Sequence, residues 1–170
     1  MIETILILDT ETTGLSPEKG AKMIEICGIL YSLRRKGILQ VYSTLLPTET
    51  NEAQHINGIE PALTAIAYPT TDYHDVLMGM ANHSQAIVAH NAPFDKQFVD
   101  LHFPQLNTLR WICTQRDFPW PCRLARKRLQ DVCEGMGVPY VNAHRALSDT
   151  MFLVECFNKV DNLINCFNPI

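Results

Sequence analysis

The sequence predicts an α/β fold, with a mixed β-sheet that carries helices on its faces. Strand-like segments come first as hairpins and later alternate with helix-like segments, which is the pattern of such a sheet. The chain has 170 residues, of which 46% are hydrophobic and 19% are charged, as in a single globular domain. We therefore expect one domain over residues 1–170. We expect no membrane span, because the longest apolar runs are far below the ~18 residues that a span needs.

Five segments have the pattern of β-strands. Each is short and mainly apolar, and they cover residues 3–9, 23–33, 38–46, 85–90 and 110–114. Asp9 closes the first, a turn at 34–37 joins the second to the third, and Pro47 ends the third. The polar residues 48–58 are expected to form a loop.

Four segments have the pattern of helices. They cover residues 70–83, 93–102, about 123–136, and 144–166. Pro69 precedes the first, which Thr70 or Thr71 would cap, and Pro93 suits the first position of the second. Glycine and proline residues at 135–139 separate the last two.

Four carboxylates occur at strand ends or helix starts of this frame. Asp9 and Glu11 lie two residues apart, so a strand points both to one side. Asp95 and Asp149 each fall in the first turns of an expected helix. Taken singly, each acid equally fits a strand end facing water or a partner of the helix dipole. Together, oxygen donors at the carboxyl ends of strands suit Mg²⁺ or Mn²⁺ rather than zinc.

His144 precedes Asp149 by five residues. Five residues of ideal helix turn through ~500°, which leaves the two side chains roughly 140° apart. They can act together only if His144 lies in the entry loop and Asp149 lies in the helix.

The net charge of −4 does not exclude a phosphodiester substrate. It comes from 14 basic and 18 acidic side chains, so it equals the charge of the four acids above, and two divalent ions would cancel it. Basic residues form two clusters, Arg34-Arg35-Lys36 in the turn and Arg123, Arg126, Lys127 and Arg128 on the third expected helix. The turn is typical of a solvated charge run. On a helix, Arg123 and Lys127 would share a face that follows a phosphate backbone.

Three motifs occur in a characteristic order: ILDTETTG at 7–14, NAPFD at 91–95, and His144 with four residues before Asp149. They resemble the exonuclease motifs of the DnaQ-like (DEDDh) 3′–5′ exonucleases, in the ribonuclease-H-like superfamily. The likeness spans about residues 3–157. It implies a ribonuclease-H-like fold, a five-stranded mixed sheet flanked by helices, and removal of nucleoside 5′-monophosphates from a 3′ end.

The resemblance also implies roles for single residues. Asp9, Glu11, Asp95 and Asp149 would hold two divalent ions, Mg²⁺ or Mn²⁺, for a two-metal hydrolysis in which His144 is the general base and Glu11 is also catalytic. The substrate contacts that we carry over are Thr10, Thr12, Gly14, Leu15, Asn57, Asn91 and Phe94. For Leu15 and Phe94, packing in the core is an equal alternative. Glu25, in mid-strand, is expected to support the structure rather than the chemistry.

The implied function is a metal-dependent exonuclease that acts on DNA 3′ ends. A 3′–5′ exoribonuclease is the closest alternative, because the choice depends on how the pocket treats a 2′-hydroxyl. An inactive domain that binds nucleic-acid ends or a polymerase is less favoured, because all motif acids are present. The expected partners are single-stranded 3′ ends and a polymerase or other nucleic-acid-processing protein. The acidic N-terminus shows no signal peptide, so we expect a cytoplasmic protein. Because the sequence ends soon after the last expected helix, we expect a free-standing exonuclease or a small separate subunit.

Overall fold

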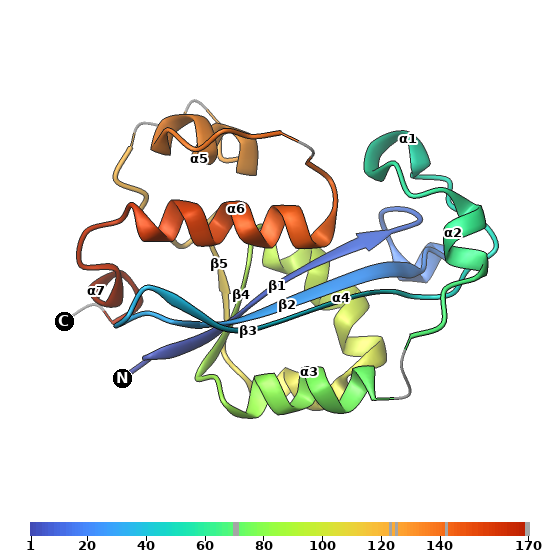
Figure 1. Cartoon of the computed structure of the whole chain (residues 1–170), viewed down its shortest axis with the longest axis horizontal. Coiled ribbons are helices and arrows are strands. Elements are labelled where there is room, and N and C mark those ends of the chain that lie inside the picture. Colours follow the sequence, from blue (N-terminus) through green and yellow to red (C-terminus); the bar gives the residue numbers. More distant parts are fainter. Residues whose placement is uncertain (70–71, 123, 125, 142, 169–170) are drawn as a thin grey trace.

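A five-stranded mixed β-sheet forms the centre of the molecule (Figure 1). The computed structural model describes residues 1–69, 72–122, 124, 126–141 and 143–168. The strands are β1 (Thr4–Thr12), β2 (Met23–Ser32), β3 (Gly37–Leu45), β4 (Ala86–Ala89) and β5 (Trp111–Cys113). Their order is β3-β2-β1-β4-β5, antiparallel from β3 to β1 and parallel from β1 to β5. The predicted five-stranded mixed sheet is therefore confirmed.

Helices cover both faces of this sheet (Figure 1). One layer consists of α5 (Leu129–Met136), α6 (Ala146–Asn158) and α7 (Leu163–Phe167). The other consists of α3 (Tyr73–Asn82) and α4 (Ala92–His102). The short helices α1 (Gln54–Asn57) and α2 (Pro61–Ala65) lie beyond the end of β1. In the described part of the chain, no helix combines the length and the apolar character needed to cross a bilayer.

The central strand β1 divides its side chains between the two helical layers. Ile5 and Ile7 belong to the core that includes α5, α6 and α7, and Leu6 and Leu8 belong to the core of α3 and α4. The strand continues to Thr12, three residues past its predicted end. Because side chains alternate along a strand, Asp9 and Glu11 extend the row that faces α6, and Thr10 extends the row that faces α4.

Two helices differ from the prediction at their ends. The helix expected from about residue 123 begins at Leu129, because Arg128 is extended and serves as its N-cap, with its backbone N–H donating to Asp131 Oδ2 at 3.0 Å. Lys127 therefore lies in a loop, and the expected basic helix face does not form; Arg123 lies outside the described residues.

The long C-terminal helix is in fact two helices. A left-handed backbone at Asn162 (φ 50°) separates α6 from α7. Asparagine tolerates this conformation better than most residues. A left-handed residue cannot continue a right-handed helix, so the chain changes direction at Asn162. The expected caps Thr70 and Thr71 lie outside the described residues, and the loop expected at 48–58 contains the one-turn helix α1.

Gly28 lies in β2 where α3 packs on the sheet. A Cβ at this buried position would lie 2.9 Å from Leu77 Cδ2 and 3.2 Å from Leu6 Cδ1. We expect Gly28→Ala to lower the free energy of unfolding by about 1–3 kcal/mol through overpacking, measured by urea denaturation. Gly79→Ala in α3 is the matched control, because a Cβ there meets nothing within 4 Å. This change should raise the free energy of unfolding by up to about 1 kcal/mol, since alanine has the higher helix propensity. Similar effects of the two changes would show that the contact at Gly28 is not tight.

Candidate active site

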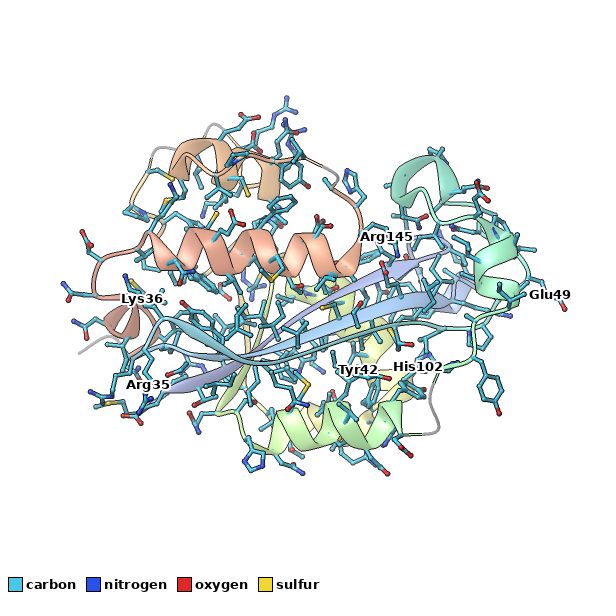
Figure 2. All side chains as sticks on the ribbon, viewed as in Figure 1. Arg35, Lys36, Tyr42, Glu49, His102 and Arg145 are labelled. Atoms are coloured by element: carbon cyan, nitrogen blue, oxygen red, sulfur yellow. The ribbon has the colours of Figure 1, made fainter. Side chains whose placement is uncertain are left out.

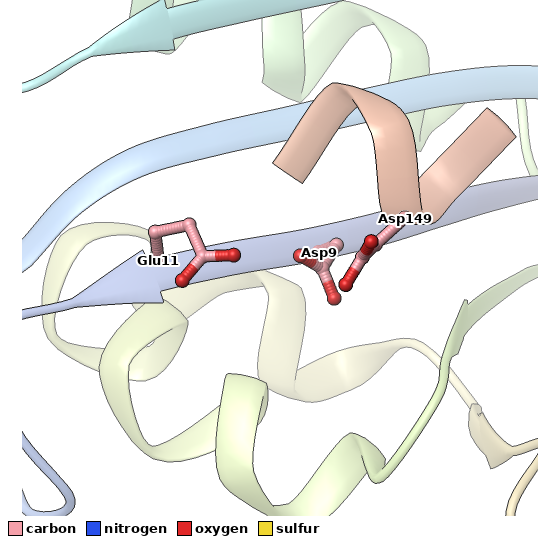
Figure 3. A group of neighbouring side chains, drawn as sticks. All are labelled: Asp9, Glu11 and Asp149. Carbon is pink, nitrogen blue, oxygen red and sulfur yellow. The ribbon is translucent and has the colours of Figure 1, made fainter. Parts of the chain in front are cut away.

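Three carboxylates meet where β1 passes below the first turn of α6 (Figure 3). Asp9 and Glu11 come from β1 and Asp149 from α6, and each offers an oxygen atom within 4.8 Å of the others. They line an open pocket of about 490 Å³ at the carboxyl ends of β1 and β4. The alternation along β1 therefore aims both strand acids at the helix that supplies the third.

Asp95 reaches the same pocket from the opposite helical layer. It lies in the first turn of α4 and is only 2% exposed. The backbone N–H and the hydroxyl of Thr10 both donate to Asp95 Oδ1, at 3.0 and 2.9 Å. Thr10, predicted as a substrate contact, thus has a clear second role, because it fixes the orientation of this carboxylate.

His144 occupies the loop that leads into α6, as its spacing from Asp149 requires. Its backbone is left-handed (φ 62°), and α6 begins two residues later. The His144 N–H donates to Asp149 Oδ1 at 3.2 Å, while the exposed imidazole lines the pocket. One hydrogen bond therefore ties the histidine loop to the carboxylate cluster.

Glu25 anchors the N-terminus of α6. Its carboxylate is buried, lies opposite Glu11 in the β1–β2 ladder, and accepts the Ala146 N–H at 2.9 Å. Arg145, labelled near the start of α6 in Figure 2, donates to it through Nε and Nη2 at 3.0 and 2.7 Å. A charge-assisted bidentate pair of this kind fixes orientation strongly. Glu25 is therefore well placed for the supporting role that the sequence suggested.

Burial and mutual repulsion raise the pKa values of all four acids. Burial is the largest cause in each case; it raises the pKa of Glu11 to about 8, that of Asp95 to about 7 and that of Asp149 to about 6. The pKa of Asp9 also lies well above its usual range, through burial and then through repulsion by Asp95, Asp149 and Glu11. The site is therefore short of positive charge, and its donors are all oxygen atoms. This combination fits a hard divalent cation such as Mg²⁺ or Mn²⁺.

Most of the predicted substrate contacts lie around this pocket. Its lining includes Thr10, Thr12, Gly14, Leu15, Asn57 and Phe94. Leu15 is 81% exposed, so it does not pack in the core, whereas Phe94 is half-buried against Phe98. The alternative of simple core packing is therefore excluded for Leu15.

The side chain of Asn57 is already used within the protein. It is buried, its Nδ2 donates to the Thr12 carbonyl at 3.2 Å, and its Oδ1 accepts from Asn51 Nδ2 and the Ile59 N–H. These bonds hold α1 against the end of β1. Asn57 thus shapes the wall of the pocket.

Asn91 is the one predicted contact outside this pocket. It lines instead a second hollow, together with Cys113 and Lys127. His90 itself lines the catalytic pocket and had no predicted role, although it is the polar residue that ends an apolar strand. The pocket is also lined by residues of the segment predicted as a polar loop, whose sequence pattern did not indicate a role in the site. These residues are Glu52, Ala53, His55 and Ile56.

The basic hairpin turn plays no part in the pocket. Figure 2 shows Arg35 and Lys36 at the opposite end of the molecule from Arg145. Arg34 pairs with the exposed Glu3 at 2.6 Å, and Lys36 Nζ donates to the Val160 carbonyl at 2.7 Å. The turn is thus a solvated and locally paired charge run.

Comparisons with known proteins agree with this geometry. A family model described as Exonuclease (RNase_T) matches residues 6–157. The DNA polymerase III subunit epsilon of Treponema pallidum is 30% identical over 172 residues, covering 89% of this chain and 74% of that protein. The PolC-type DNA polymerase III of Thermotoga petrophila is 28% identical over 91% of this chain, which spans only 12% of that much longer protein.

A solved structure shares the fold. The zinc-bound complex of Escherichia coli ExoI with single-stranded DNA superimposes with a TM-score of 0.74 and 16% sequence identity. The match covers 98% of this chain and 41% of that one. The ribonuclease-H-like arrangement expected from the motifs is therefore confirmed.

The raised pKa values predict how pH and divalent cations affect stability. Acids with raised pKa values in the folded state favour folding below their unfolded pKa values, near 4, and lose this contribution as pH rises through about 6, 7 and 8. A bound cation removes the penalty, so Mg²⁺ should raise the urea midpoint more at pH 8 than at pH 5. Because only the Mg²⁺-induced difference is compared at each pH, other titrating groups largely cancel.

The control for this measurement is Asp9→Asn, which removes one member of the cluster. We expect the Mg²⁺-induced increase to shrink strongly in this variant. An equal increase at both pH values, or one that survives the substitution, would contradict a cation site at these carboxylates.

Proposed function

Because the chain belongs to the DnaQ-like family of 3′–5′ exonucleases, we propose that it hydrolyses the last phosphodiester bond at the 3′ end of DNA and releases nucleoside 5′-monophosphates. The observation that carries the proposal is the cluster of Asp9, Glu11 and Asp149 in an open pocket with His144 at its edge. DNA is favoured as the substrate because the relative is named as a subunit of a DNA polymerase and the solved structure holds single-stranded DNA.

We propose Asp9, Glu11, Asp95 and Asp149 as the holders of two divalent ions, Mg²⁺ or Mn²⁺. Four carboxylates with raised pKa values provide more negative charge than one divalent ion cancels. When bound, such ions stabilise the charge that builds up on the phosphate oxygens and make water easier to deprotonate.

His144 is the general base in this proposal. Its imidazole lines the pocket and is exposed to solvent. The hydrogen bond from its backbone N–H to Asp149 keeps the residue beside the carboxylates. A ring nitrogen accepts the proton of the attacking water, which is the role that histidine most often fills near neutral pH. Glu11 would be the second catalytic group, because its carboxylate lines the same pocket and would help to hold an ion there.

The 3′-terminal nucleotide would occupy the mouth of the pocket. The exposed Leu15 and the half-buried Phe94 offer apolar surface for its base, and the turn from Thr12 to Gly14 brings backbone groups close to its sugar. Gly14 keeps this turn narrow, since a Cβ there would lie 3.3 Å from Ala21 Cβ.

We also propose that residues 1–170 act as one exonuclease domain in the cytoplasm, alone or beside a polymerase or other nucleic-acid-processing protein. The family match across residues 6–157 and the relationship to a polymerase subunit support this.

A time course on 5′-labelled single-stranded DNA and RNA of matched sequence tests the function. With Mg²⁺ or Mn²⁺ we expect a ladder that shortens from the 3′ end, faster on DNA, and none with EDTA. Asp9→Asn should lower the rate by more than the ~10–100-fold that loss of a supporting metal-site partner costs. Faster cleavage of RNA would overturn the choice of substrate, and full activity of Asp9→Asn would overturn the site.

His144→Ala separates proton transfer from cation binding. We expect a rate loss of about 10²–10⁴-fold, the usual contribution of a general base, with the Mg²⁺-induced rise in the urea midpoint unchanged. His83→Ala, an exposed histidine after α3, should change neither quantity. A parallel loss of activity and of Mg²⁺ stabilisation in His144→Ala would assign His144 to cation binding instead.

A further inference from the structure

A second hollow lies beside the catalytic pocket, at the carboxyl ends of β4 and β5. Its volume is about 490 Å³, and it is lined by Asn91, Pro93, Cys113, Gln115, Arg116 and Lys127. Ligands of open α/β sheets bind at this edge, where the catalytic pocket also lies. The hollow thus lies at the same edge of the sheet as the catalytic pocket, one strand further along.

His90 connects the catalytic pocket to the hollow through one hydrogen bond. It lines the pocket on one side, and its Nε2 lies 2.9 Å from the Lys127 carbonyl, which can only accept a hydrogen bond. Nε2 therefore carries the proton, and Nδ1 faces the Thr114 hydroxyl at 3.0 Å. Burial lowers the pKa of His90 to about 4, so this neutral tautomer persists near pH 7. The backbone of Lys127, which lines the hollow, is thus held by a residue of the catalytic pocket.

The charge of the hollow is opposite to that of the pocket. Arg116 Nε and Nη2 are held by Asp117 at 2.7 and 3.0 Å, which fixes the guanidinium at the rim. Lys127 is exposed, and its ammonium takes part in none of the ion pairs found among the described residues. Because Asp117 balances the charge of Arg116, Lys127 supplies the positive charge that attracts a phosphate to the hollow, whereas the four carboxylates of the catalytic pocket repel one.

Asn91 adds an uncommitted hydrogen-bond donor. Its backbone is left-handed (φ 66°) at the start of α4, and its exposed side chain makes no capping hydrogen bond to the helix. In this position its amide can donate to a phosphate oxygen, while Asp95, one turn along the same helix, faces the catalytic pocket.

We propose that this hollow binds the phosphate backbone of the single-stranded substrate upstream of its 3′-terminal nucleotide, through Lys127, Arg116 and Asn91. The inference rests on the proposed function and specifies where the strand leaves the catalytic pocket. The hollow on the other side of the site, beside Arg145 and Ser148, is less suited, because Arg145 is the one basic residue among the described residues of its lining and is paired with the buried Glu25, whereas the proposed hollow also has Lys127.

The test compares Lys127→Glu with substrates of different length. On a 12-nucleotide single strand, we expect KM to rise about tenfold with kcat within twofold, because the strand loses an anchor outside the reacting site. On the p-nitrophenyl ester of thymidine 5′-monophosphate, which fills only the catalytic pocket, the variant should match the unchanged protein. The slope of log Kd against log salt should also fall by ~0.7 for the 12-mer, the value for one lost phosphate contact to a single strand.

Two further variants keep the test specific. Arg110→Glu makes the same charge change at an exposed position before the first residue of β5, so it should leave the KM for the 12-mer nearly unchanged. Asn91→Gly removes the amide while keeping the left-handed backbone without strain, and should raise that KM a few-fold.

The outcomes separate the two proposals. If the unchanged protein cleaves neither substrate, the proposed function fails. If it cleaves both, but Lys127→Glu and Arg110→Glu alter the KM for the 12-mer equally, or Lys127→Glu impairs the small ester as much as the 12-mer, the hollow is not a backbone site.

Discussion

The alternation of side chains along β1 determines which carboxylates of the proposed active site face each helical layer. In the first half of β1, alternate apolar side chains pack against the two helical layers. The polar side chains at the end of β1 follow the same alternation. Asp9 and Glu11 therefore meet α6, and Thr10 meets α4 and holds Asp95. A shift of register by one residue would exchange the two rows and separate the acids, so the packing of both cores maintains the site.

The acids are costly to keep together, and neutral hydrogen bonds and one ion pair limit the cost. Thr10 donates twice to Asp95, the backbone of His144 donates to Asp149, and Arg145 compensates Glu25. None of these contacts places a cationic side chain in an ion pair with Asp9 or Glu11. Within the described part of the chain, these acids therefore lack a positive partner, which is why we propose the site as a cation site.

Much of the fold followed from local patterns, because β-strand alternation and proline or glycine boundaries are written in neighbouring residues. The motif acids and the position of His144 in a loop were also predictable, the latter because helix geometry cannot bring residues 144 and 149 to one face. The start of α5 was not, since it depends on a cap formed by Arg128 and Asp131. The roles of Asn57 and His90 depend on Thr12 and on Thr114 and Lys127, which are far away in the sequence, so spacing cannot reveal them.

The contact of Glu25 with the start of α6 gives the site an all-or-none character. His144 and Asp149 lie on either side of this anchor and are bonded to each other. If this end of α6 opened locally, His144 and Asp149 would leave the pocket together, while Asp9 and Glu11 would stay on the central strand. Under the proposed mechanism, such a partly open molecule would be inactive, because it would lose a metal ligand and the general base at the same time.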